Sequence, residues 1–155
     1  MNTSMRTNDL GLLLKQAEAL LENEKDPIAN MANLSALIFN SIENLNWAGF
    51  YIYKDKELVL GPFQGLPACV RLQLNKGVCG TAAAQRRTIT VADVHAFEGH
   101  VACDSASNSE VVVPILIDEL IYGVLDIDSP VIDRFDPELV SFFEDIVALF
   151  KKTSF

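Results

Sequence analysis

The side chains most capable of chemistry gather around Cys103. Residues 99–110 contain a thiol, an imidazole, two carboxylates and three hydroxyls, and a strand-like apolar run over residues 111–117 follows at once. Reactive groups on a loop that a rigid scaffold holds in place are a common layout for active sites. The pattern therefore favours redox or nucleophilic chemistry at Cys103.

Two further cysteines, Cys69 and Cys79, lie in segments punctuated by glycine and proline. A reactive cysteine needs some exposure and a neighbour that lowers its pKa, because the thiolate is the nucleophile. His100 could supply a positive charge to Cys103, although Asp104 would oppose it. A free cysteine is often only a small buried apolar residue, and for Cys69 or Cys79 considered singly the pattern favours that interpretation.

Zinc binding is the competing chemistry for these side chains. The potential ligands are Cys69, Cys79, His95, His100 and Cys103. Structural zinc sites usually contain a cysteine pair with two to four residues between its members, and no pair in this chain has that spacing. Dinucleotide-binding and phosphate-loop motifs are missing from the sequence as well. We therefore expect no metal and no organic cofactor.

A second group of reactive side chains consists of carboxylates. In the segment 125–128, Asp126 and Asp128 fall on the same face of a predicted strand, because side chains alternate along a strand. Glu110 opens the preceding strand, and a hairpin turning at residues 118–119 would bring Glu110 beside Asp128. Mutual repulsion and partial burial would raise at least one pKa and make a proton donor at neutral pH. The alternative is a solvated strand face or a cap at the strand exit.

Trp47 and Tyr51 are the aromatic candidates. Both lie on the first predicted strand, four residues apart, and so on one face. They could wall a small pocket, although an ordinary core-packing face would show the same pattern.

Composition restricts the classes of partner. The 155 residues fit one domain, and the net charge of −9 argues against a nucleic-acid footprint and against adsorption to an anionic membrane. No apolar run approaches the roughly 20 residues of a membrane span, and residues 1–7 lack the apolar core of a secretion signal. Three cysteines are too few for a disulfide scaffold. We expect a cytoplasmic protein with reduced thiols.

Hydrophobic periodicity and turn residues predict the elements that position these groups. Helices are expected over residues 8–22, 27 to about 45, 81–85 and 136–150, and strands over 47–53, 57–63, 88–91, 111–117 and 120–127. Residues 65–80 appear irregular, and 93–109 form a long polar loop. Hairpin-connected strands with helices at both ends indicate an α+β fold. Its mostly antiparallel sheet would have five to six strands, with helices on one side and ligand-binding loops on the other.

Four segments together resemble the free methionine-(R)-sulfoxide reductases, which are single GAF domains. They are GPFQGLPAC (61–69), KGVCG (76–80), the polar run ending at Glu110, and GVLDIDSP (123–130). Asn75 stands where that family usually has glycine and Glu98 where proline is common; neither carries a reactive group. The resemblance implies a GAF-like (PAS-like) domain over residues 1–155.

The resemblance also implies an activity, the thiol-dependent reduction of free L-methionine-(R)-sulfoxide. By this resemblance Cys103 would be the nucleophile, Cys69 the resolving thiol and Cys79 an auxiliary thiol. Glu110 and Asp128 would protonate the sulfoxide oxygen. Asp126 would bind the substrate ammonium group, and Trp47 would pack on the substrate methyl group with Tyr51 nearby. Thioredoxin would recycle the disulfide, and the chain would form a homodimer. The chemistry is consistent, because a sulfoxide oxygen leaves only when protonated and a sulfenic acid condenses readily with a second thiol.

Two other functions stay open at this point. A GAF domain can be a non-catalytic module that binds a small molecule, since a fold alone does not settle function. The cysteines could instead serve a peroxide sensor. The order in which Cys69 and Cys79 would act is undecided, and loop structure is the expected role of His100.

Overall fold

The computed structural model describes residues 7–101 and 103–155. The expectation that the chain lacks a secretion signal rests on residues 1–7, and residues 1–6 lie outside the described part. Ala102 of the polar loop lies outside it as well. The helices are α1 (Thr7–Leu21), α2 (Pro27–Ser41), α3 (Gly77–Gln85) and α4 (Pro137–Ser154). The strands are β1 (Trp47–Lys54), β2 (Glu57–Gly65), β3 (Arg71–Gln73), β4 (Ile89–Val91), β5 (Ser109–Ile117) and β6 (Leu120–Ser129).

The six strands form one antiparallel sheet in the order β3-β2-β1-β6-β5-β4. Two hairpins, β1–β2 and β5–β6, meet at the centre, where Ala48 on β1 pairs with Ile127 on β6. The predicted turn of the second hairpin is confirmed: Asp118 and Glu119 both have positive φ, as a two-residue turn that matches the strand twist requires. The predicted α+β class and antiparallel sheet are confirmed.

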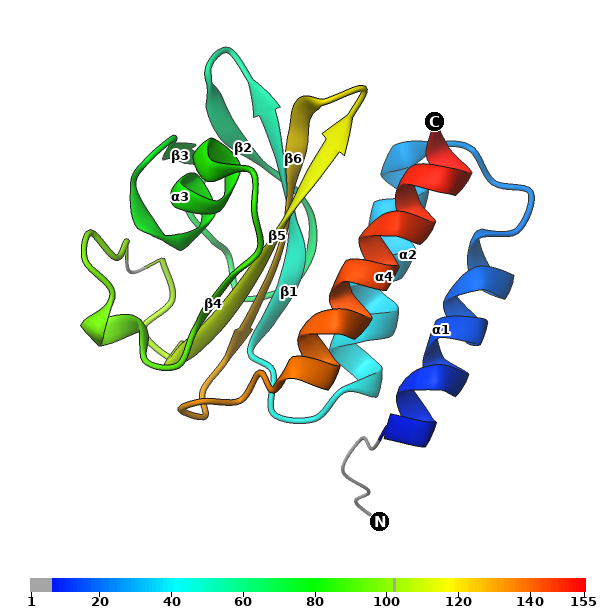
Figure 1. The fold of residues 1–155 in the computed structure, drawn as a ribbon, viewed down its shortest axis with the longest axis horizontal. Coiled ribbons are helices and arrows are strands. Elements are labelled where there is room, and N and C mark those ends of the chain that lie inside the picture. The colour runs from blue at the N-terminus through cyan, green and yellow to red at the C-terminus, as the bar shows by residue number, and fades with distance from the viewer. Residues whose placement is uncertain (1–6, 102) are drawn as a thin grey trace.

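The two faces of the sheet carry different layers. Helices α2 and α4 cover one face, α1 packs against the outer side of these two helices, and α3 lies on the opposite face with the long loop (Figure 1). Side chains alternate accordingly: Phe50 and Leu125 pack into the core beneath the three helices, while Tyr51 and Val124 pack into a second core on the α3 side. Among the described helices, none has the length and apolar character needed to cross a membrane.

Aspartates cap the starts of α2 and α4, as the Asp-Pro pairs predict. The Asp26 carboxylate accepts from Ile28 N at 2.8 Å at the start of α2, and the Asp136 carboxylate accepts from Leu139 N at 2.9 Å at the start of α4. Each of these N-cap hydrogen bonds fixes the residue at which its helix begins.

Several predicted boundaries were wrong. Helix α2 ends at Ser41 rather than near 45, and α4 continues to Ser154. The segment predicted as irregular contains β3, whose three residues are too few to show a period. Helix α3 begins at Gly77 rather than 81, because Gly77 takes a φ of 66° and Gly80 lets the helix approach the Gln73 carbonyl closely. The polar loop includes a short 3-10 helix, Val94–Ala96.

Candidate active site

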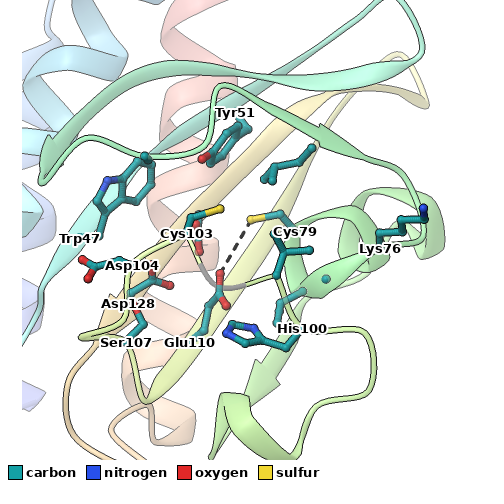
Figure 2. Close-up of a pocket in the computed structure, with 16 residues that line it drawn as sticks. Trp47, Tyr51, Lys76, Cys79, His100, Cys103, Asp104, Ser107, Glu110 and Asp128 are labelled. Carbon is teal, nitrogen blue, oxygen red and sulfur yellow. Dashed lines mark hydrogen bonds between the residues drawn. The ribbon is translucent and has the colours of Figure 1, made fainter.

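A narrow pocket lies on the α3 side of the sheet, between α3, the β1 and β6 strands and the loop that carries Cys103 (Figure 2). Seven of the eight predicted site residues line it: Trp47, Tyr51, Cys79, Cys103, Glu110, Asp126 and Asp128. Its cavity volume is about 40 Å³. Residues far apart in the sequence thus meet at one small site.

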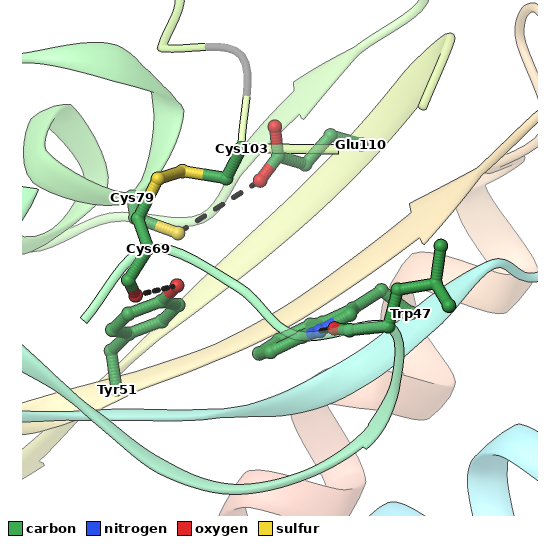
Figure 3. Close-up of a disulfide and its surroundings, with 7 residues drawn as sticks. Trp47, Tyr51, Cys69, Cys79, Cys103 and Glu110 are labelled. Carbon is green, nitrogen blue, oxygen red and sulfur yellow. Dashed lines mark hydrogen bonds between the residues drawn. A yellow bond between two sulfur atoms is a disulfide. The ribbon is translucent and has the colours of Figure 1, made fainter. Parts of the chain in front are cut away.

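The eighth predicted residue, Cys69, is joined to Cys103 by a disulfide (Figure 3). The S–S distance is 2.00 Å and the Cα atoms lie 5.5 Å apart across 34 residues of sequence. This Cα separation falls within the range of about 7 Å that a bridge tolerates without backbone movement. The two thiols assigned to successive steps can therefore react directly with each other.

Cys79 is the free thiol of this group. It is buried near the start of α3, and its Sγ donates to Glu110 Oε2 at 3.8 Å (Figure 2). Burial, followed by the charges of Asp126 and Glu110, raises the pKa of Cys79 well above its usual value. The thiol is therefore protonated at neutral pH and is not an activated nucleophile in this state.

The expected carboxylate cluster is present. Glu110 on β5 pairs in register with Asp128 on β6, and Asp126 lies two residues away on the same face. The exposed fractions of Glu110, Asp126 and Asp128 are 7%, 5% and 9%. One oxygen of Asp126 and one of Asp128 are buried without a hydrogen-bond partner within the described part of the chain. Buried polar atoms are normally satisfied, so these oxygens are available to a ligand.

Burial controls the protonation of the cluster. It raises the pKa of Glu110 well above its ordinary range, and the charges of Asp126 and Asp128 raise it further. Burial and the charge of Asp126 likewise raise the pKa of Asp128. Burial also raises the pKa of Asp126, although hydrogen bonds from Glu110 and Cys79 oppose the shift. The site can hold carboxylic acids as proton donors at neutral pH.

Two aromatic rings form the wall toward β1. Trp47 and Tyr51 stack with centroids 5.8 Å apart, and both are almost fully buried. Trp47 Nε1 donates to the Leu66 carbonyl at 3.2 Å, and the Tyr51 hydroxyl donates to the Cys69 carbonyl at 2.8 Å. Burial raises the pKa of Tyr51, which keeps this hydroxyl a donor. The wall therefore also fixes the segment that carries Cys69.

Asn46 holds the opposite loop in place, a role that sequence analysis did not predict. Its Nδ2 donates to Asp104 Oδ2 and to Ser107 Oγ, each at 2.9 Å, and its backbone N donates to the Asp128 carbonyl at 3.0 Å. The loop that carries Cys103 is thereby tied to the start of β1. An asparagine before a strand is common in turns, so its pattern does not distinguish this function.

His100 lies at the wall of the pocket, although loop structure alone was expected of it (Figure 2). Its Nδ1 is buried without a partner among the described residues, and its ring meets the ring of His95 edge-on with centroids 6.3 Å apart. Burial and then the charge of His95 lower the pKa of His100. A neutral imidazole does not supply the positive charge that was considered for activating Cys103.

The geometry places cysteine sulfurs beside carboxylic acids. A nucleophilic sulfur at Cys103 would face a wall that can protonate a leaving oxygen, and a second thiol at Cys69 stands close enough to form a bridge. The five-residue zinc set of cysteines and histidines does not converge. The ligand atoms that do converge, among the described residues, belong to Cys79, Glu110 and Asp126.

Comparison with known proteins gives consistent matches across most of the chain. A family model described as GAF domain matches residues 29–150. Protein YtsP of Bacillus subtilis (strain 168) is 59% identical over 133 residues, which cover 84% of this chain and 82% of that protein. The free methionine-R-sulfoxide reductase of Escherichia coli (strain K12) is 48% identical over 140 residues, covering 90% of this chain and 85% of that protein.

Solved structures show the same fold at high identity. The reduced form of fRMsr of Staphylococcus aureus superimposes with a TM-score of 0.93 at 52% identity and covers 99% of both chains. A structure of the Staphylococcus aureus fRMsr in complex with substrate gives a TM-score of 0.91 at 51% identity, over 98% of this chain and 99% of that one.

Proposed function

The chain belongs to the GAF-domain family and, within it, to the free methionine-R-sulfoxide reductases, which are oxidoreductases, and we propose that it reduces free L-methionine-(R)-sulfoxide through a cysteine sulfenic acid. The observation that carries this proposal is the Cys69–Cys103 disulfide at a pocket lined by three buried carboxylates. Such a bridge is the oxidised product expected from the reaction.

In the first step the Cys103 thiolate attacks the sulfur of the sulfoxide. Glu110 and Asp128 protonate the sulfoxide oxygen, which then transfers to Cys103 as the S–O bond to the substrate breaks. Methionine leaves, and Cys103 becomes a sulfenic acid, so the substrate sulfur gains the two electrons that Cys103 loses. The raised pKa of Glu110 supports this role, because only a protonated carboxyl can donate.

In the second step the Cys69 thiol attacks the sulfenic sulfur and displaces water, which forms the disulfide. The Cα separation of 5.5 Å supports Cys69 as the resolving thiol. Cys79 is the auxiliary candidate, because it lies in the same pocket and bonds to Glu110. A dithiol protein, thioredoxin, would then reduce the bridge by disulfide exchange.

Selection of the free amino acid follows from the charge of the pocket. Asp126, with an unpartnered buried oxygen, would hold the substrate ammonium, and Trp47 would pack on the substrate methyl with Tyr51 beside it. A methionine within a peptide carries no ammonium group at that position, so it would lose this contact. The reaction as proposed uses no metal and no organic cofactor.

The proposal extends to the whole chain. Residues 1–155 would form one GAF domain, and two copies would associate as a homodimer in the cytoplasm. These statements rest on the family membership rather than on the geometry of the site.

The activity is tested by measuring the conversion of sulfoxide to methionine in four substrates in the presence of dithiothreitol: the free R and S sulfoxides and a peptide containing either epimer. We expect release from the free R epimer alone, and none from the Cys103→Ser variant. Equal turnover of the S epimer, or wild-type turnover by Cys103→Ser, would refute the proposal. A disulfide that forms rapidly with peroxide while no sulfoxide is consumed would favour the sensor function instead.

A further inference from the structure

Three buried side chains bring ligand atoms of two chemical kinds together at the inner end of the pocket. The Cys79 sulfur, one oxygen of Glu110 and one oxygen of Asp126 all lie within 4.8 Å of one another. All three residues are less than a tenth exposed. They come from α3, β5 and β6, so the packing of three separate elements holds the set in place.

The spacing of these atoms suits a metal ion. In a tetrahedral complex with a metal–sulfur bond of about 2.3 Å and a metal–oxygen bond of about 2.1 Å, sulfur and oxygen lie about 3.6 Å apart. The Cys79 Sγ to Glu110 Oε2 distance is 3.8 Å. A cation could therefore take the place of the thiol proton between these two atoms with little movement of either side chain (Figure 2).

A second observation points to a ligand at this place. Asp126 Oδ1 and Asp128 Oδ1 are buried and find no partner in the described part of the chain. A buried unpartnered carboxylate oxygen is rare and calls for an explanation such as an ion. The cavity of about 40 Å³ has room for about three waters, which fits a cation that keeps one or two water ligands.

The donor set selects the class of cation. A thiolate is a soft ligand that Mg²⁺ and Ca²⁺ avoid, whereas Zn²⁺ accepts sulfur together with carboxylate oxygen. Binding would involve no change of oxidation state. The Cys79 sulfur and the Glu110 carboxylate would each donate an electron pair to the cation, and the protons of the Cys79 thiol and the Glu110 carboxyl would pass to the solvent.

We propose that Cys79, Glu110 and Asp126 form a binding site for a divalent cation of the zinc class. Three protein ligands leave one coordination position open toward the pocket, where water would bind. Glu110 and Asp126 are also the residues assigned to the substrate, so a bound cation excludes the substrate from the site. That consequence rests on the proposed function, whereas cation binding itself does not.

Co²⁺, which replaces Zn²⁺ in tetrahedral sites and absorbs light, is the probe for this test. The chain has three cysteines, and two are in the disulfide, so a titration of one free thiol per chain verifies the starting protein. A near-ultraviolet band from thiolate to Co²⁺ can then arise from Cys79 alone. We expect this band to saturate with added Co²⁺, to disappear on addition of Zn²⁺, and to be missing in Cys79→Ser.

A second pair of variants provides a test that does not depend on how well Cys79→Ser tolerates a serine at a buried position. Glu110→Gln removes a ligand without changing the size of the side chain, and Asp118→Asn removes a carboxylate at the β5–β6 turn as its matched control. Affinity for Co²⁺ should fall at least about tenfold in Glu110→Gln and stay unchanged in Asp118→Asn. A missing band, a band that survives in Cys79→Ser, or equal affinity in both carboxylate variants would overturn the proposal. Failure of the reductase assay would leave the binding result intact.

Discussion

At the scale of single residues, the site works by giving three sulfur atoms different environments. Cys69 and Cys103 are bonded to each other, while Cys79 is buried against Glu110. Burial raises the pKa of Cys79, and the charges of Asp126 and Glu110 raise it further. The same burial that makes an acid of Glu110 therefore keeps Cys79 from competing as a nucleophile.

The order of the thiols is tested by removing each resolving candidate separately. Cys69→Ser should release about one methionine per site and then stall, because the sulfenic acid on Cys103 finds no direct partner. Cys79→Ser should continue to turn over with dithiothreitol. Methionine is counted over time by chromatography. Stalling in Cys79→Ser combined with steady turnover in Cys69→Ser would reverse the assignment.

Glu110 should show its protonation in the pH dependence of stability. Its pKa is raised in the folded protein, so its contribution to stability is complete at low pH and is lost as the pH rises through the folded pKa. Gln mimics the protonated form and does not titrate. The midpoint of thermal unfolding of Glu110→Gln should therefore exceed that of the wild type at pH 9, and the two should converge toward pH 4.

The matched control for that experiment is Glu119→Gln, at an exposed position in the β5–β6 turn, which should show no such divergence. A difference in unfolding midpoint between Glu110→Gln and the wild type that stays constant over the whole pH range would contradict the proposed protonation.

The activity of Glu110→Gln should fall by about 10²- to 10⁴-fold, as expected when a general acid is lost.

At the scale of elements, two hairpins bring the reactive groups together. The β5–β6 register places Glu110 opposite Asp128, and the β1–β6 register places Trp47 opposite the same aspartate. Two loops supply Cys69 and Cys103, and α3 supplies Cys79. The sheet thus carries the carboxylates, while the segments packed on its α3 side carry the three cysteines.

Asn46 connects the sheet to the loop that carries Cys103, and its removal should loosen that loop. In Asn46→Ala, two hydrogen bonds to Asp104 and Ser107 are lost, which should cost about 1–3 kcal/mol of stability and increase hydrogen exchange in residues 103–108. The rate of disulfide formation after sulfoxide addition should fall. Asn40→Ala is the control, because its Nδ2 donates to the Ala36 carbonyl on the exposed side of α2. Equal effects from both variants would refute the tethering role.

Some elements could be predicted from the sequence, and the reasons are local. Asp-Pro pairs mark the starts of α2 and α4, and the alternation around Asp126 separates the carboxylates on one face of β6 from the core residues on the other. The strand β3 could not be predicted because its three residues are too few to show a period. The start of α3 could not be predicted because it depends on a positive φ at Gly77 and close approach at Gly80. Asn46 and the pocket position of His100 were missed because only tertiary contacts distinguish them.

At the scale of the whole molecule, the sheet separates the larger hydrophobic core from the pocket that holds the reactive side chains. The larger core lies between the sheet and the helix layer that α1, α2 and α4 form, and the pocket lies on the opposite face of the sheet. Ile146 of α4 is fully buried in that core. A change there should therefore affect unfolding without altering the site.

Ile146→Val tests this separation. The lost methylene should lower the free energy of unfolding by about 0.5–1.5 kcal/mol, measured by urea denaturation, while kcat/KM for the free R sulfoxide stays at the wild-type value at a temperature where both proteins are folded. A drop in kcat/KM as large as the drop in stability would show that the helix layer and the site are coupled.

The central claim is that Cys103 reduces the sulfoxide and that Cys69 then closes the bridge. Reduced protein is mixed with one equivalent of free L-methionine-(R)-sulfoxide without reductant and quenched in acid at successive times. Methionine is quantified, and the disulfide is located by mass spectrometry of peptides. We expect one methionine and one Cys69–Cys103 bridge per chain, with methionine appearing no later than the bridge. A bridge that forms without methionine release, or methionine release with Cys103 unmodified, would contradict it.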